Sequence, residues 1–324
     1  MPLAAEDLSL LVLVVDVNPF FWAQRPPSLP TFHDFLSQLR VFLNAYLLLH
    51  SANKAAVIAT GYSSCAFVHP TPPVASSSSS STSAPPSTSS PAEDAIAQLL
   101  SFAAAEAERA KGESSSSSAA AAATGIVREQ ASLLSGSLSM ALAYCVKASS
   151  KGSSAPRPRI LCIHGSPDAA QQYVAIMNAI FSSQKAGAGM YVAIMNAIFS
   201  SQKAGVPIDA CAIGASDSAF LQQAAFLTGG LYLHSTRPNA LLQDLLLVFG
   251  VDQFSRDFIT LPQPSAVDFR ASCFCHKQPV DLGFVCSVCL SIFCAPARTC
   301  ATCGADFASA KRTRVNPPQQ QQPQ

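Results

Sequence analysis

The stretch Leu10-Leu-Val-Leu-Val-Val15, followed directly by Asp16-Val-Asn-Pro19, decides the fold. An unbroken run of Leu and Val is typical of a strand that is buried on both faces, as in a parallel sheet with helices on each side. A helical period follows over 31–47, where Thr31 and Asp34 have the spacing of a capping box. A buried strand followed by a covering helix indicates an α/β protein.

The same alternation of strand and helix continues to about residue 250. We expect further strands at 55–60, 65–69, 159–164, 207–213 and 231–234, the one at 65–69 being antiparallel to its neighbour. We expect further helices at 92–111, 126–146, 217–228 and 238–249. This order predicts a doubly wound sheet of about six strands with helices on both faces, spanning 1–250.

Two low-complexity insertions and a tandem duplication interrupt this domain. Residues 71–91 are almost wholly Ser, Pro, Thr and Ala, and 112–124 are mainly Ser and Ala, so we expect solvated loops at both places. Residues 173–187 recur letter for letter as 191–205. One copy is enough to join two neighbouring strands, and we expect the other to form an appended helix or loop.

Cysteines dominate the C-terminal part, where seven of the eleven lie beyond residue 272. Two C-x-x-C knuckles can close a tetrahedron of thiolates around a structural Zn²⁺, with no position left open for water or substrate. The predicted ligands of this site are Cys286, Cys289, Cys300 and Cys303. A second, interleaved site could be formed by Cys273, Cys275, His276 and Cys294. The alternative for this second set is that some members are packing cysteines or ligands of a degenerate site.

Composition narrows the classes of function. Apolar residues make up 49% of the 324, charged residues 12%, and the formal net charge is +1, so no long-range field would recruit nucleic acid. The apolar run at 10–15 is preceded by Glu6 and Asp7 and is too short to span a bilayer, so neither secretion nor membrane insertion is expected. We expect a linker at 251–271, a zinc module at 272–308 and a disordered tail at 309–324.

Three motifs carry a resemblance to a known family. They are Leu13-Val-Val-Asp-Val-Asn-Pro-Phe20, Thr228-Gly-Gly-Leu-Tyr232, and Cys273-Phe-Cys-His276 together with Cys286-Ser-Val-Cys-Leu-Ser-Ile-Phe-Cys294. The chain resembles the thirty-four-kilodalton subunits of general transcription factor TFIIH nearly end to end. It departs from them in the two insertions, the duplicated segment and the Gln-rich end.

The resemblance implies a von Willebrand A-like domain, a small C-terminal zinc module and residence in the nucleus. It further implies a non-catalytic scaffold role in the TFIIH core during RNA polymerase II initiation and nucleotide excision repair. The implied partners are the other core subunits, chiefly the larger von Willebrand A/zinc subunit. Sequence-specific nucleic-acid binding and membrane binding are not expected.

The loop after the first strand disfavours Mg²⁺. Von Willebrand A domains that bind Mg²⁺ use an Asp-x-Ser-x-Ser loop, because a small hard ion takes short oxygen ligands and keeps waters. Here Phe20 stands at the place of the second hydroxyl, so we expect Asp16 to hydrogen-bond the neighbouring loop instead and Asp168 to serve no metal.

Two other classes of function compete with the scaffold. A RING-type ubiquitin ligase would need both zinc sites filled, and a zinc-ribbon nucleic-acid binder would need Lys or Arg between the knuckles, where none stands from 286 to 297. No nucleophile elbow, phosphate loop or Rossmann glycine pattern is present, so no catalytic or cofactor-binding residue is predicted. The letters of a catalytic triad in His164-Gly-Ser166 and Asp168 are neighbours in sequence, and a triad brings distant residues together.

Overall fold

The computed structural model of the chain describes two compact units, 1–268 and 269–324, and each is treated by itself. In the first unit the described residues are 9–25, 27, 29–70, 90–116, 131–149, 156–168, 193–214, 217–235, 240–262 and 267. In the second they are 270, 273, 275–276, 280–288, 291–296, 298–301 and 304–306. Within these ranges no helix combines the length and apolar character that crossing a membrane requires.

A six-stranded sheet with the order β3-β2-β1-β4-β5-β6 forms the centre of the first unit. Its strands are β1 (Ser9–Asp16), β2 (Lys54–Thr60), β3 (Cys65–His69), β4 (Arg157–His164), β5 (Ile208–Ala212) and β6 (Tyr232–His234). All neighbours are parallel except β2 and β3, whose register shifts at Val57 and Ile58. The strand number and the antiparallel β3 confirm the predictions from the sequence.

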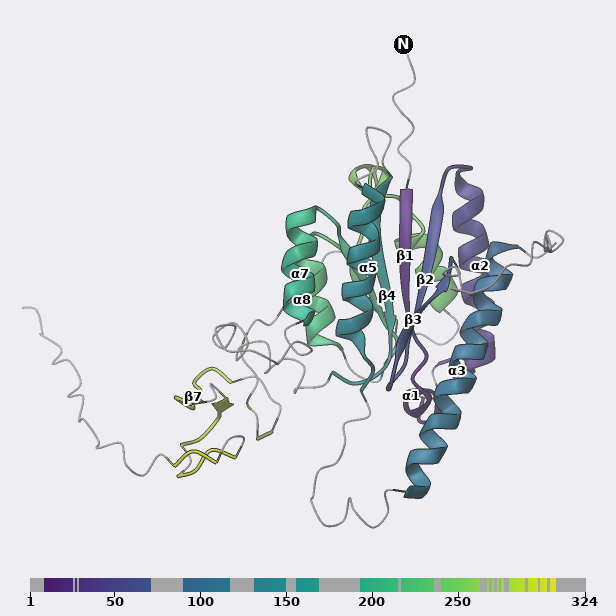
Figure 1. Ribbon diagram of the computed structural model, residues 1–324. Helices are drawn as coiled ribbons and strands as arrows, with labels where there is room; N and C mark the ends of the chain where they lie inside the picture. The colour runs from purple at the N-terminus through teal and green to yellow at the C-terminus, as the bar shows by residue number, and fades with distance from the viewer. Residues whose placement is uncertain are drawn as a thin grey trace, which may run out of the picture. The chain divides into compact units, whose positions relative to one another are not determined.

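Helices cover both faces of this sheet (Figure 1). One face is covered by α1 (Pro19–Ala23), α2 (Phe32–Leu49), α3 (Pro91–Ser116), and α9 (Leu241–Asp244) with the π-helix Leu245–Phe249. The other face is covered by α5 (Leu134–Ser149), α7 (Ala193–Ala204) and α8 (Ala219–Thr228). Successive β1 residues alternate between these two cores, so the whole of β1 is buried, as the apolar run predicted.

Capping hydrogen bonds set where several helices begin. Thr31 caps α2, and its Oγ1 accepts the N–H of Asp34 at 3.2 Å, as predicted. The helix α8 is capped by Ser218, not opened by Asp217 as predicted, because Ser218 Oγ accepts the N–H of Leu221 at 3.2 Å. Its other end is the left-handed Gly229, with φ of 70°.

Both ends of α3 enter regions predicted as loops. Ser90 and Glu93 form a capping box, in which the N–H of Glu93 donates to Ser90 Oγ at 3.2 Å and Ser90 N–H donates to Glu93 Oε2 at 3.1 Å. Positions 90 and 91 therefore belong to the helix start, and its other end continues to Ser116 within the predicted loop 112–124. The rest of both predicted loops, 71–89 and 117–124, lies outside the described residues.

The helix predicted at 126–146 begins later than expected. Leu133 N–H donates to the carbonyl of Gly61 at 2.9 Å, so residues 131–133 follow the β2–β3 turn and α5 starts at Leu134. Residues 126–130 lie outside the described part. The second copy of the duplication supplies α7, which leads into β5, and the first copy at 173–187 also lies outside it.

Part of the predicted linker packs back onto the first unit. A 3-10 helix, Ser255–Phe258, carries Arg256, which forms a bidentate ion pair with the fully buried Asp209 of β5. The second unit contains the two-stranded hairpin β7 (Phe284–Val285) and β8 (Ile292–Phe293).

Candidate functional site

Asp16 and His164 meet at the carboxyl ends of β1 and β4, which are neighbours in the sheet. The carboxylate of Asp16 is buried and its Oδ2 lies 3.1 Å from His164 Nδ1. The same oxygen accepts the backbone N–H groups of Gly165 at 3.1 Å and Ser166 at 2.8 Å, and Oδ1 accepts the N–H of Asn18 at 3.1 Å. These bonds to the neighbouring loop confirm the predicted role of Asp16.

Asn18, the other oxygen donor of the loop, is also engaged by the chain itself. Its Oδ1 accepts the N–H of Phe20 at 3.1 Å, and its Nδ2 donates to Ser166 Oγ at 3.0 Å. Trp22 also bonds to this loop, because its Nε1–H donates to the backbone carbonyl of Asp16 at 2.9 Å. The short oxygen ligands that a Mg²⁺ would take are therefore committed to bonds within the protein.

Packing fixes the backbone of this loop as well. A Cβ built on Gly165 would stand 2.1 Å from Cζ of Phe21, so only glycine lets α1 approach the end of β4 this closely. The approach brings the loop after β1 and the loop after β4 into contact.

Electrostatics favour an ion pair between Asp16 and His164. Burial raises the pKa of Asp16, but the positive charge of His164 and the hydrogen bonds from Ser166 outweigh burial and hold the pKa below its ordinary value of 3.8. Burial likewise lowers the pKa of His164, and the charge of Asp16 reverses that shift and raises the pKa above 6.5. The two groups thus favour each other's charged forms at this end of the sheet.

Asp168 makes hydrogen bonds to α8 and acts on His164 through its charge. Burial raises the pKa of Asp168, and its carboxylate accepts the Ser218 Oγ–H at 2.6 Å and the N–H of Phe220 at 3.3 Å. It therefore holds the first turn of α8, while its charge helps to raise the pKa of His164.

In the second unit, the structure brings together the candidates for a second site. The ligand atoms of Cys273, Cys275, His276 and Cys294 all lie within 4.8 Å of one another. Sγ of Cys275 and Sγ of Cys294 are 3.4 Å apart, and His276 Nδ1 lies 3.3 Å from Cys294 Sγ and 4.0 Å from Cys273 Sγ. Four ligands of a tetrahedral Zn²⁺ are separated by about 3.5–3.8 Å when Zn–S is about 2.3 Å and Zn–N about 2.0–2.1 Å. The set fits such an ion and could hold a metal.

Crowding of the thiols in this cluster opposes their ionisation while no metal is bound. Hydrogen bonding with Cys275 is the main cause that raises the pKa of the Cys294 thiol to about 11. Each proton held this way must leave when a metal binds, because thiolate is the form that ligates.

The two knuckles are folded alike at their first cysteines. Cys286 N–H donates to the carbonyl of Ser291 at 2.9 Å, and Cys300 N–H donates to the carbonyl of Ala305 at 2.8 Å, five residues on in both cases. Both cysteines are buried against Phe293. The second cysteines, Cys289 and Cys303, lie outside the described residues, so the set of Cys286, Cys289, Cys300 and Cys303 stays a prediction.

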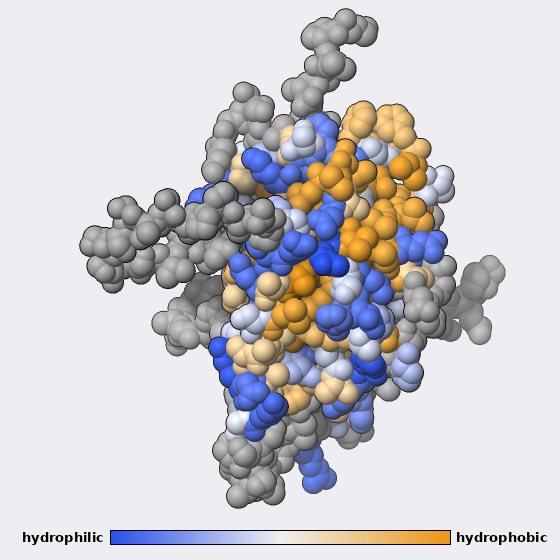
Figure 2. Space-filling model, turned by 90° about the vertical axis from the view of Figure 1, so that its right-hand side faces the viewer, coloured by the Kyte–Doolittle hydropathy of each residue, from blue (hydrophilic) through white to orange (hydrophobic). Residues whose placement is uncertain are grey.

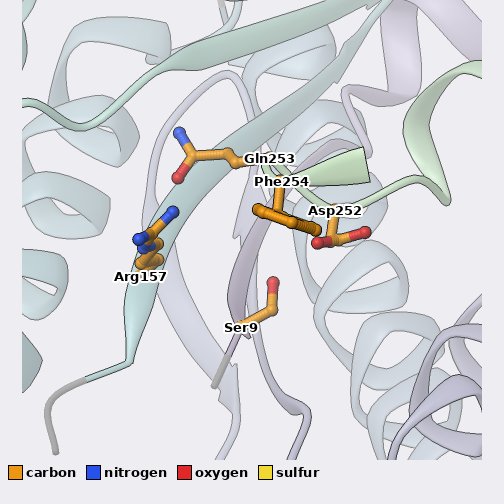
Figure 3. A pocket seen from close by; sticks show the side chains of 5 residues that line it. All are labelled: Ser9, Arg157, Asp252, Gln253 and Phe254. Carbon is orange, nitrogen blue, oxygen red and sulfur yellow. The ribbon is translucent and has the colours of Figure 1, made fainter. Parts of the chain in front are cut away.

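A small hollow opens at the amino ends of β1 and β4 (Figure 3). It is lined by Ser9 and Arg157, which are register partners, and by Asp252, Gln253 and Phe254 from the segment after the π-helix. Its volume of about 10 Å³ has room for about one water molecule. It is therefore no site for an organic ligand.

A family model described as transcription factor Tfb4 matches residues 8–189 and 186–304. The chain belongs to the Tfb4 family. The general transcription and DNA repair factor IIH subunit TFB4 of Arabidopsis thaliana is 42% identical to it over 307 residues, covering 95% of this chain and 91% of that protein. The general transcription factor IIH subunit 3 of Dictyostelium discoideum is 34% identical over 288 residues, covering 86% and 68%.

A solved structure extends the family assignment to the fold. The crystal structure of the TFIIH p34 N-terminal domain superposes with a TM-score of 0.52 and 23% identity, covering 75% of this Tfb4 chain and 99% of that domain. The fold of the first unit is the doubly wound sheet with helices on both faces that the sequence predicts.

Proposed function

We propose that this Tfb4 chain is a non-catalytic scaffold subunit of the TFIIH core. It acts in the nucleus, in RNA polymerase II initiation and nucleotide excision repair, by holding other subunits through protein–protein contacts. The chief partner is the larger subunit with von Willebrand A and zinc modules. Family membership and the names of the relatives, which are general transcription and DNA repair factors, support this role.

The observation that carries the scaffold proposal is the closed loop at the carboxyl ends of β1 and β4. Both oxygens of Asp16 and both polar side-chain atoms of Asn18 are bonded within the chain, and His164 Nδ1 lies 3.1 Å from Asp16 Oδ2. Partner binding through an ion held in this loop would have to break these hydrogen bonds. Partner binding through the outer surfaces of the two units would leave these hydrogen bonds intact.

Structural Zn²⁺ completes the proposal. Cys286, Cys289, Cys300 and Cys303 would form a closed site, and the cluster around Cys294 a second one. A bound Zn²⁺ would supply folding energy to the small second unit, with no open position for catalysis.

Coexpression with the other TFIIH core subunits tests the proposal. We expect the full-length chain to copurify with at least one of them, and equally well whether Mg²⁺ is added or omitted. Omission is preferable to chelation, because a chelator would also strip Zn²⁺. Three outcomes would contradict the proposed scaffold function. They are binding that requires Mg²⁺, transfer of ubiquitin in a reconstituted assay, and copurification with no subunit.

A further inference from the structure

An apolar patch lies where the carboxyl end of α2 meets the segment after the π-helix. Its members, called here the α2-end patch, are Leu48, Leu49, Phe254, Phe258 and Ile259. Leu48 is 84% exposed and Phe258 76%, although both are large apolar side chains. Figure 2 shows a broad hydrophobic area on the face of the first unit that carries the α2 side of the sheet.

A groove of about 470 Å³ adjoins the patch and shares Leu49 and Ile259 with it. Leu49 and its neighbour His50 line the groove at the end of α2, Leu246 lines it from the π-helix, and Val251 and Ile259 line it from the segment that follows. The rings of Phe254 and Phe258 lie 5.3 Å apart, which continues the patch beyond Ile259.

The polar groups in the floor of the groove already bond to one another. Tyr46 OH donates to Ser9 Oγ at 2.9 Å, and Asn53 Nδ2 donates to the carbonyl of Tyr46 at 2.9 Å. Apolar side chains can therefore lie against Tyr46 OH and Asn53 Nδ2 without taking away their hydrogen-bond partners.

The size of the patch points to a protein interface. Five large side chains exposed to this extent present on the order of 600 Å² of apolar surface, at roughly 200 Å² for a whole side chain. The largest patch on a typical monomer is about 300–600 Å² and is often functional, and one partner of a stable interface contributes about 800 Å². The patch thus covers most of the area that one partner needs.

The shape and charge of the groove define its occupant. A concave groove fits a convex rod such as a helix, and two copies of one chain would each have to supply both groove and rod in a two-fold interface. Among the groove-lining residues Asp252 is an acid and none is Lys or Arg. The complementary ligand is an amphipathic helix with apolar side chains at i, i+3, i+4 and i+7 and a basic residue near Asp252.

We propose that the α2-end patch binds an apolar, partly basic helix of another protein subunit. This inference rests on the proposed scaffold function and names the surface that would perform it.

The test uses the full-length chain with Leu49→Lys, which lies in both patch and groove, and Phe258→Lys combined. Leu49 is in the last turn of α2, where a cation is favourable, and Phe258 is 76% exposed, so folding should be unaffected. The matched control is Phe226→Lys, also near the end of its helix, 53% exposed and on α8 at the other face of the sheet.

The probes are the other TFIIH core subunits, each coexpressed singly with the wild-type chain, the double variant or the control. Affinity is measured on the purified pair, and hydrogen exchange maps protection over 46–53 and 246–259.

We expect one subunit to bind the wild-type chain and the control alike and the double variant at least tenfold more weakly, with protection at the groove. Equal binding by the double variant would overturn the patch and leave the scaffold function standing. Copurification of no subunit would instead contradict the proposed function itself. Dimerisation of the wild-type chain that the double variant abolishes would assign the patch to a second copy, and protection of the groove in the free chain would assign it to the chain's own segments. Either result overturns the proposal.

Discussion

Asp209 is the buried acid that lies against two arginines of the first unit, and Asp209→Asn is predicted to destabilise this unit strongly. Its carboxylate is fully buried, pairs with Arg256 in a bidentate contact, and lies 3.5 Å from Arg159 Nη1. Arg159 is itself fully buried, with its guanidinium carbon 5.6 Å from the ring centre of Tyr46. Among the described residues none hydrogen-bonds its three guanidinium nitrogens, so Asp209 is its nearest compensation.

The size of the effect follows from the charges left behind. The amide keeps an oxygen for the N–H of Leu231, now accepted by Asp209 Oδ1 at 2.9 Å, but it removes the carboxylate that pairs with both guanidinium groups. Breaking a buried ion pair in this way costs about 3–5 kcal/mol, out of a total stability of about 5–15 kcal/mol. With a urea dependence of about 2 kcal/mol per molar, the midpoint should fall by roughly 2 M.

The assay is urea unfolding followed by fluorescence of Trp22, the chain's single tryptophan. Trp22 packs against Phe32 and Phe35 in the first unit, so the signal reports this unit and not the second one. The control Glu108→Gln makes the same chemical change in an exposed pair with Lys111 and should cost less than about 1 kcal/mol. A loss below about 1 kcal/mol for Asp209→Asn as well would refute the reasoning that this acid neutralises buried arginines.

Three further predictions concern the metal cluster, the buried pair and the duplication. Cys294→Ser should lower the zinc content measured by atomic absorption by one equivalent and leave the Trp22 unfolding transition unchanged; undiminished zinc would remove this residue from the ligand set. The raised pKa of His164 should contribute its full stabilisation of the first unit below pH 6.5, the ordinary histidine pKa. This contribution is lost as the pH rises through the higher pKa of His164 in the folded chain. On the aspartate side, the contribution is complete above pH 3.8 and is lost as pH falls through the lowered pKa. Urea midpoints from pH 6 to 9 should therefore decline for the wild type and stay flatter for His164→Asn; parallel curves would argue against the ion pair. Deleting residues 173–190 should leave thermal unfolding close to that of the full chain, since the second copy supplies α7, and a large loss of stability would show that the first copy is part of the fold.

Patterns that repeat along the chain made most of the fold predictable. The apolar run of β1 indicates a strand that is buried on both faces. The short-range capping signal of Thr31 with Asp34 correctly predicted where α2 begins. Errors arose where distant partners fix a boundary: the bond from Leu133 to Gly61 delays the start of α5, and no periodicity records it. The capping box of Ser90 was missed because it stands inside a serine-rich run.

The sites divide in the same way. Spacing alone pointed to the Cys and His residues of the C-terminal part, four of which the structure gathers into one cluster. His164 was considered only together with its sequence neighbours Ser166 and Asp168, because its partner Asp16 is 148 positions away in the sequence. The usable signal was topological, since both residues end strands that become neighbours in the sheet. The charged set around Asp209 carries no local signal, because its three members come from β4, β5 and the segment after the π-helix.

The two edges of the six-stranded sheet affect how readily unassembled copies of the chain aggregate. One edge is β6, only three residues long, and the other is β3, whose pairing with β2 is interrupted by a register shift. Short or irregular edges are poor templates for strand-to-strand aggregation. An unassembled copy of this chain is thus guarded against fibrillar growth along the sheet of its first unit.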